Sequence, residues 1–126
     1  MKRIRLISIL NLLASGAMLA GCSRSGSGAS AMLPESKVPA TVNQAFAKAP
    51  VEIKEEAAGA IAAFQGADAS LAFAQLQKMS SEPNLTAPER AAVAKAKQVA
   101  FLKLQTAAQN GDAAAQSTMN HYLSSR

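Results

Sequence analysis

Apolar residues recur at intervals of three and four positions from about residue 41 onward, which predicts amphipathic α-helices. The recurrence is clearest between Pro50 and Gly66, in a stripe made of Ile53, Ala57, Ala60, Ile61 and Phe64. Similar patterns predict four further helices, over about 42–46, 69–79, 87–109 and 113–123. No strand-like alternation of apolar and polar residues follows the first 22 residues. The pattern therefore predicts an all-α domain of four to five helices, packed as stacked helical hairpins or a small bundle.

Capping residues set the expected ends of these helices. Thr41, Asp68 and Asp112 each precede a predicted helix, where a side-chain oxygen can accept a hydrogen bond from a free amide. The segment Thr86-Ala87-Pro88-Glu89 is a capping box, in which the Thr86 hydroxyl and the Glu89 carboxylate each accept from the amide of the other residue. We therefore expect the longest helix to begin directly after Thr86.

The remaining apolar stripes contain many small residues and few large ones. They consist of Ala69, Ala72, Phe73, Leu76 and Met79, then Val93, Ala96, Ala100, Leu104 and Ala107 widened by Phe101 and Leu102, and finally Ala115, Met119 and Tyr122. Burial of alanine stabilises a fold much less than burial of leucine or phenylalanine. We therefore expect modest stability as a monomer and a tendency to self-associate or to pair with a partner protein.

The first 21 residues have the three parts of a secretion signal peptide. A basic start, Met1 to Arg5, precedes a largely apolar segment from Leu6 to Leu19, and small residues follow. The apolar segment is shorter than the roughly 20 residues of a membrane-spanning helix. We therefore predict that residues 1–21 are removed on export.

The tetrapeptide Leu19-Ala20-Gly21-Cys22 resembles the lipobox of bacterial lipoproteins. The resemblance implies cleavage between Gly21 and Cys22, attachment of diacylglycerol to the Cys22 thiol and acylation of the new amino group. It also implies an envelope location, and the absence of an aspartate at Ser23 favours the outer membrane, facing the periplasm. The alternative is an ordinary signal peptide with a cysteine near the cut. Cys22 is the only cysteine, so the chain has no internal disulfide.

Residues 22–40 are rich in Ser, Gly and Pro, which predicts a flexible tether between the lipid anchor and a helical domain at residues 41–126. Loss of Lys2, Arg3 and Arg5 with the signal lowers the formal net charge from +5 to +2. The basic balance of the full chain therefore gives no indication of a nucleic-acid partner.

Residues that could perform chemistry are sparse. His121 is the only histidine and has no cysteine or acidic cluster at metal-ligand spacing, so no metal or cofactor is predicted. Glu52, Glu55 and Glu56 form the densest acidic group, and we interpret them as a solvated, salt-bridged first helical turn, with acid–base catalysis as the alternative.

The longest predicted helix is basic. Its cations Arg90, Lys95, Lys97 and Lys103 lack the interleaved aromatic residues of a nucleic-acid surface. We interpret them as a solvated face, which can also meet anionic lipid head groups.

The segment from Ala107 to Gln116 is similar to the start of a Sel1-like repeat, a relative of the tetratricopeptide repeat. The turns around Asp68 and Asp112 also resemble each other. The resemblance covers about ten residues, and Met119-Asn120 stand where the family has Leu-Gly. It implies stacked helical hairpins, and the alternative is that similar turns arise independently in Ala-rich helices, whose ends require Gly and Asp.

Three functions remain open from the sequence. The first is an accessory or structural envelope lipoprotein that binds another protein and performs no catalysis. The second is a module that binds a small ligand or cell-wall glycan, and its plausible lining residues are Phe46, Phe64, Phe73 and Tyr122. The third is a small hydrolase that would need His121, a serine and a carboxylate to converge.

Overall fold

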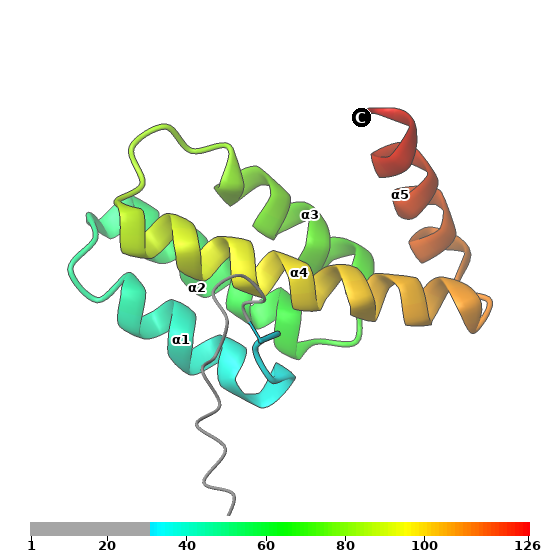
Figure 1. Ribbon diagram of the computed structural model, residues 1–126, viewed down its shortest axis with the longest axis horizontal. Helices are drawn as coiled ribbons and strands as arrows, with labels where there is room; N and C mark the ends of the chain where they lie inside the picture. Colours follow the sequence, from blue (N-terminus) through cyan, green and yellow to red (C-terminus); the bar gives the residue numbers. More distant parts are fainter. Residues whose placement is uncertain (1–30) are drawn as a thin grey trace, which may run out of the picture.

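The structure of this chain is a computed structural model that describes residues 31–126 (Figure 1). All regular structure in these residues is helical, which confirms the predicted all-α class. A short 3-10 helix precedes five α-helices: η1 (Glu35–Lys37), α1 (Val38–Ala45), α2 (Val51–Gln65), α3 (Ala69–Ser80), α4 (Ala87–Gln109) and α5 (Ala113–Ser124). The predicted signal peptide, Cys22 and residues 22–30 of the predicted tether lie outside the described residues.

The long helix α4 is the central element of the fold. It packs against α1, α3 and α5, while α2 packs between α1 and α3. In Figure 1, α4 runs along the length of the molecule, and α5 turns away from its C-terminal end. The helices α1 to α4 therefore form one bundle, and α5 is attached to it through α4 and the neighbouring part of α3.

Local hydrogen bonds fix the helix ends where the sequence predicted them. Asp68 Oδ1 accepts from the amide of Leu71 at 2.9 Å, and Asp112 Oδ1 accepts from the amide of Ala115 at 3.0 Å. The capping box at the start of α4 is complete: Glu89 Oε2 accepts from the Thr86 amide at 2.8 Å.

The reciprocal bond of the capping box joins the Glu89 amide to Thr86 Oγ1 at 3.4 Å. Glu89 is buried, and its capping hydrogen bond compensates part of the cost of removing a carboxylate from water. Arg90, the next residue, donates from Nη2 to the carbonyl oxygen of Leu85 at 2.7 Å, and the Leu85 side chain is buried. These bonds fix the angle at which the chain enters α4.

The predicted apolar stripes form the core. The largest fully buried side chains belong to Phe46, Phe64, Leu76, Met79, Leu104, Val38, Val42 and Val93. Alanines fill the remaining inner positions of α4, and Ala96 and Ala100 have no exposed surface. The predicted widening of this stripe by Leu102 is wrong, because the Leu102 side chain is 41% exposed on the outer side of α4.

The first helix begins earlier than the sequence pattern predicted. Thr41 was expected to cap it, but α1 starts at Val38 and contains Thr41 within its helical residues. Pro39 suits the first turn because its ring fixes a helical φ and its missing amide has no helical acceptor there. Val38 is completely buried, so the helical domain includes residues that we had assigned to the tether up to position 40.

The two turns that resemble each other in sequence have different backbone geometry. Gly66 is extended, with φ −75° and ψ 177°, whereas Gly111 adopts a φ of 91°. A positive φ favours glycine, which explains Gly111 between α4 and α5. The two turns therefore share the aspartate cap and differ in the conformation of the glycine.

We expect Thr86→Ala to lower the free energy of unfolding by about 1 kcal/mol, because it removes the capping acceptor at the start of α4. Chemical denaturation of the mature chain measures this change. Thr106→Ala is the matched control, because Thr106 is exposed within α4 and donates only to the Leu102 carbonyl. Equal effects of the two substitutions would contradict a stabilising role for the capping box.

Candidate functional site

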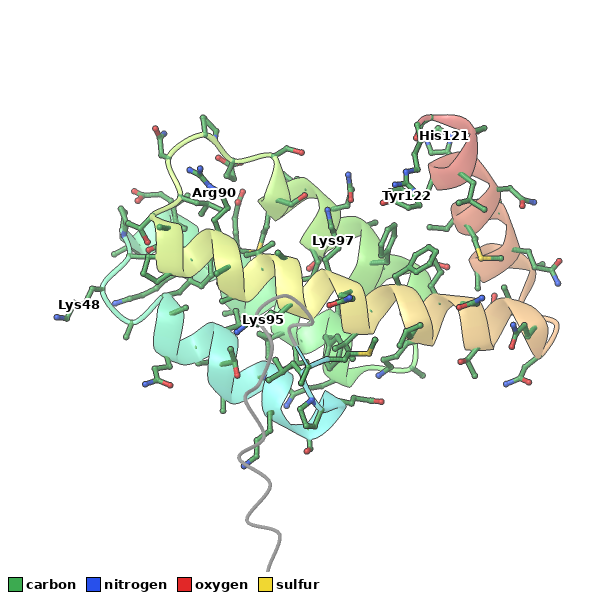
Figure 2. The ribbon with its side chains drawn as sticks, viewed as in Figure 1. Lys48, Arg90, Lys95, Lys97, His121 and Tyr122 are labelled. Carbon is green, nitrogen blue, oxygen red and sulfur yellow. The ribbon has the colours of Figure 1, made fainter. Side chains whose placement is uncertain are left out.

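Three aromatic rings from three helices meet between α4 and α5. The Phe73 and Tyr122 rings lie edge to face with their centroids 5.0 Å apart, and Phe101 lies 5.7 Å from each of them. Such tilted arrangements of aromatic rings are favourable beyond the area that they bury. In Figure 2, Tyr122 extends from α5 toward the bundle, so this cluster joins α5 to the rest of the fold.

A cleft of about 250 Å³ opens beside the three rings, and we call it the aromatic cleft. Its lining consists of Phe73, Ala94, Lys97, Gln98, Phe101, Tyr122 and Arg126. The Arg126 guanidinium lies 5.7 Å from the centroid of the Tyr122 ring, and Lys97 Nζ lies 3.4 Å from Ser80 Oγ. The aromatic cleft thus combines an apolar floor with cationic and amide groups at its rim.

A second hollow of about 640 Å³ lies where the described chain begins, and we call it the N-terminal groove. One wall is formed by Met32, Leu33 and Pro34, and the remaining lining residues are Glu35, Ala67, Ala69, Val99, Leu102, Lys103, Thr106, Ala107 and Asn110. Met32 is 45% exposed and Leu102 is 41% exposed. The groove therefore presents apolar side chains to its surroundings.

Lys103 holds the N-terminal wall of this groove against the bundle. Its Nζ donates to Glu35 Oε1 at 2.8 Å and to the carbonyl oxygen of Phe64 at 3.0 Å. The same amine lies 4.6 Å from the centroid of the Phe64 ring. Because Lys103 is partly buried and bonded to both segments, it connects η1, the end of α2 and α4 at one point.

The four aromatic residues predicted to line a ligand site do not converge. Phe46, Phe64 and Phe73 are buried, and only Tyr122 is half-buried at the surface. Phe73 and Tyr122 do meet, but the third ring of their cluster is Phe101, which the sequence placed only in the apolar stripe of α4. Its position four residues after Lys97 on α4 was the available signal that it lies beside a basic residue.

The acidic residues of α2 have different surroundings. Glu52 and Glu55 are exposed, whereas Glu56 Oε1 accepts from Lys78 Nζ of α3 at 3.0 Å. This hydrogen bond and the charge of Glu56 raise the pKa of Lys78 above its ordinary value of 10.5. Glu56 therefore contributes an ion pair between α2 and α3.

The other residues considered for chemistry are dispersed. His121 is exposed on α5, and Figure 2 shows it near the C-terminal end of this helix, close to Tyr122. Within residues 31–126, no three His, Cys, Asp or Glu residues are grouped closely enough to hold a metal ion. None of the described helices is both long enough and apolar enough to cross a membrane.

The basic residues of α4 form no single patch. Successive residues of an α-helix are rotated by about 100°, so Lys95 and Lys97 lie on nearly opposite sides of α4. Arg90 is bonded to Leu85, and Lys103 is paired with Glu35. These cations therefore act at separate places on the surface.

No protein-family model, curated protein or solved structure matches this chain. The two hollows on α4 are therefore the candidate sites that its own geometry supports.

We expect Tyr122→Ala to loosen α5, because the substitution removes two ring contacts from a helix whose only buried residue is Ala115. The lost contacts amount to about 2 kcal/mol, which corresponds to roughly 30-fold faster amide hydrogen exchange in α5. Exchange measured by mass spectrometry should change in α5 and not in α2.

His121→Ala is the control for this measurement, because His121 is exposed on the same helix next to Tyr122. If both variants exchanged at the same rate as the unchanged protein, the aromatic cluster would not be what attaches α5.

Proposed function

We propose that this chain is a lipid-anchored protein of the bacterial envelope that binds another protein through the aromatic cleft and performs no catalysis. The observation that carries the proposal is the meeting of Phe73, Phe101 and Tyr122 beneath a rim that contains Arg126. Aromatic residues and arginine are enriched at the centres of protein–protein interfaces, where they contribute most of the binding energy.

The dimensions of the aromatic cleft favour a protein partner over a small ligand or glycan. Small-molecule sites usually enclose roughly 300–1,000 Å³ and bury most of the ligand surface. The cleft has about 250 Å³, and its floor residue Phe73 is only 3% exposed. A side chain of a partner protein fits a shallow hollow of this kind, while the surrounding surface supplies the rest of the contact area.

The envelope location in the proposal rests on the start of the sequence. The Leu19-Ala20-Gly21-Cys22 segment follows a basic and apolar leader, and it supports lipid attachment at Cys22. Ser23 in place of aspartate supports the outer membrane, with the helical domain in the periplasm.

The surroundings of His121 support a non-catalytic role. The two nearest serines in the sequence after it, Ser124 and Ser125, donate their hydroxyl protons to the main-chain carbonyls of His121 and Tyr122. A serine nucleophile would instead donate to an imidazole nitrogen. A small hydrolase therefore has no support from this part of α5.

A photoreactive amino acid at position 98 tests whether a partner protein binds at the aromatic cleft. Gln98 is exposed at the rim of the aromatic cleft, so irradiation of cells should give a discrete covalent adduct with one envelope protein. The same amino acid at position 109 is the control, because Gln109 is exposed on α4 away from the cleft. We expect Tyr122→Ala to abolish the adduct at position 98.

Equal adducts at positions 98 and 109, or none at position 98, would contradict the proposed binding surface. Cys22→Ser tests the anchor in the same cells, because the serine hydroxyl does not receive the lipid. The variant should leave the membrane fraction if Cys22 carries the anchor.

A further inference from the structure

We infer that the N-terminal groove rests on the lipid surface to which Cys22 is anchored, with Met32 and Leu102 touching that surface. The inference rests on the proposed lipidation of Cys22. It extends that proposal by assigning the helical domain a membrane-facing side, which leaves the aromatic cleft on the other flank of α4.

The length of chain between the anchor and the groove limits where the domain lies. Met32 follows Cys22 by ten residues, and an extended chain spans at most about 3.3–3.6 Å per residue. The groove wall is therefore within about 35 Å of the anchored sulfur. Because this wall is made by the first described residues, Met32 to Pro34, the groove is the part of the domain nearest in sequence to the membrane.

Two exposed, large apolar side chains meet at this groove. Among residues 31–126, the large hydrophobic residues with substantial exposure are Met32, Val51, Leu71, Leu102 and Leu123. Met32 and Leu102 are the two of these that line one hollow together. Their partly exposed side chains form an apolar contact suited to the interfacial region of a bilayer.

The position of Met32 is fixed relative to α4. Leu33 packs against the core, and Glu35 is bonded to Lys103 at 2.8 Å. Lys103 is bonded in turn to the Phe64 carbonyl. The groove is therefore a defined part of the bundle surface. Because Glu35 and Lys103 pair their charges with each other, the apolar side chains are the part of the groove that meets the lipid.

Because Cys22 is anchored in the bilayer, a small contact is sufficient to keep the groove at the lipid surface. A short tether holds the groove near the membrane at an effective concentration of about millimolar, so the contact needs little intrinsic affinity. A lipid anchor combined with a second, weaker membrane contact is a common way to hold a domain at a surface.

The rotation of α4 separates the two hollows. At about 100° per residue, Val99 and Lys103 of the groove lie on the side of α4 opposite to Ala94 and Phe101 of the cleft, while Leu102 follows Gln98 by one turn on the outer face between them. When the N-terminal groove rests on the lipid, the aromatic cleft therefore lies on the other flank of α4, where a protein partner has access to it.

A fluorescent label on an introduced cysteine tests this orientation. Cys22 is the only cysteine, and its lipid thioether cannot react, so Leu102→Cys supplies the only free thiol of the lipidated mature chain. The labelled protein is inserted by its anchor into vesicles of phosphatidylethanolamine and phosphatidylglycerol, with or without bromine on the acyl chains. Leu71→Cys is the matched control, because Leu71 is 46% exposed on α3 and does not line the groove.

We expect brominated lipid to quench the label at position 102 about twofold more strongly than the label at position 71. Equal quenching, or no quenching at position 102, would overturn the inference. A blue shift at position 102 without quenching would also overturn it: a shift that grows with protein density would assign the groove to a second copy, and one that needs added envelope proteins would assign it to a protein partner.

The intact mass of the purified chain shows whether Cys22 carries lipid. It therefore distinguishes a wrong orientation of the groove from a wrong assignment of the anchor. A chain that carries acylated Cys22 but shows no quenching at position 102 refutes only the membrane-facing groove. A chain without lipid, which would also accept a second label at Cys22, refutes the proposed anchor and the inference together.

Discussion

The close packing of α4 against α1 and α3 determines the rest of the structure. Val93, Ala96, Ala100 and Leu104 form the inner side of α4 and have no exposed surface. Two of these residues are alanines, so the helices approach closely and α4 is held in one rotation. That rotation places the N-terminal groove and the aromatic cleft on opposite sides of the helix.

Contacts outside the packed inner side of α4 attach the two ends of the domain to this helix. Lys103 of α4 bonds to Glu35 and to the end of α2. The rings of Phe73 and Phe101 pack against Tyr122 of α5. An ion pair with partial exposure contributes little stability by itself, whereas the packed aromatic rings contribute more. The N-terminal segment is therefore positioned by Lys103 together with burial of Val38, and α5 depends chiefly on its aromatic contacts.

The parts of the fold that depend on neighbouring residues were predictable from the sequence. Asp68, Asp112 and the Thr86–Glu89 pair act within three residues, and their hydrogen bonds are those expected from their spacing. The start of α1 was placed too late, because Thr41 is a residue typical of an N-cap, whereas burial of Val38 begins the helix three residues earlier.

The candidate sites depend on residues that are distant in the sequence. Lys103 and Glu35 are 68 positions apart, and the aromatic cluster takes one ring from each of three helices. Helical periodicity indicated that Phe73 and Tyr122 face inward, but it contains no information on which helices are neighbours. The same limit explains why Leu102 was placed in the core: the width of an apolar stripe does not show how much of it a neighbouring helix covers.

The free energy of unfolding of Ala100→Leu tests the central packing most directly. Ala100 is completely buried, so the larger side chain should force α4 away from its neighbours and destabilise the domain by about 1–3 kcal/mol. Ala91→Leu, on the exposed side of α4, should leave the unfolding midpoint nearly unchanged. An Ala100→Leu variant as stable as Ala91→Leu would contradict the account, because α4 would then not be held by close contact at its alanine positions.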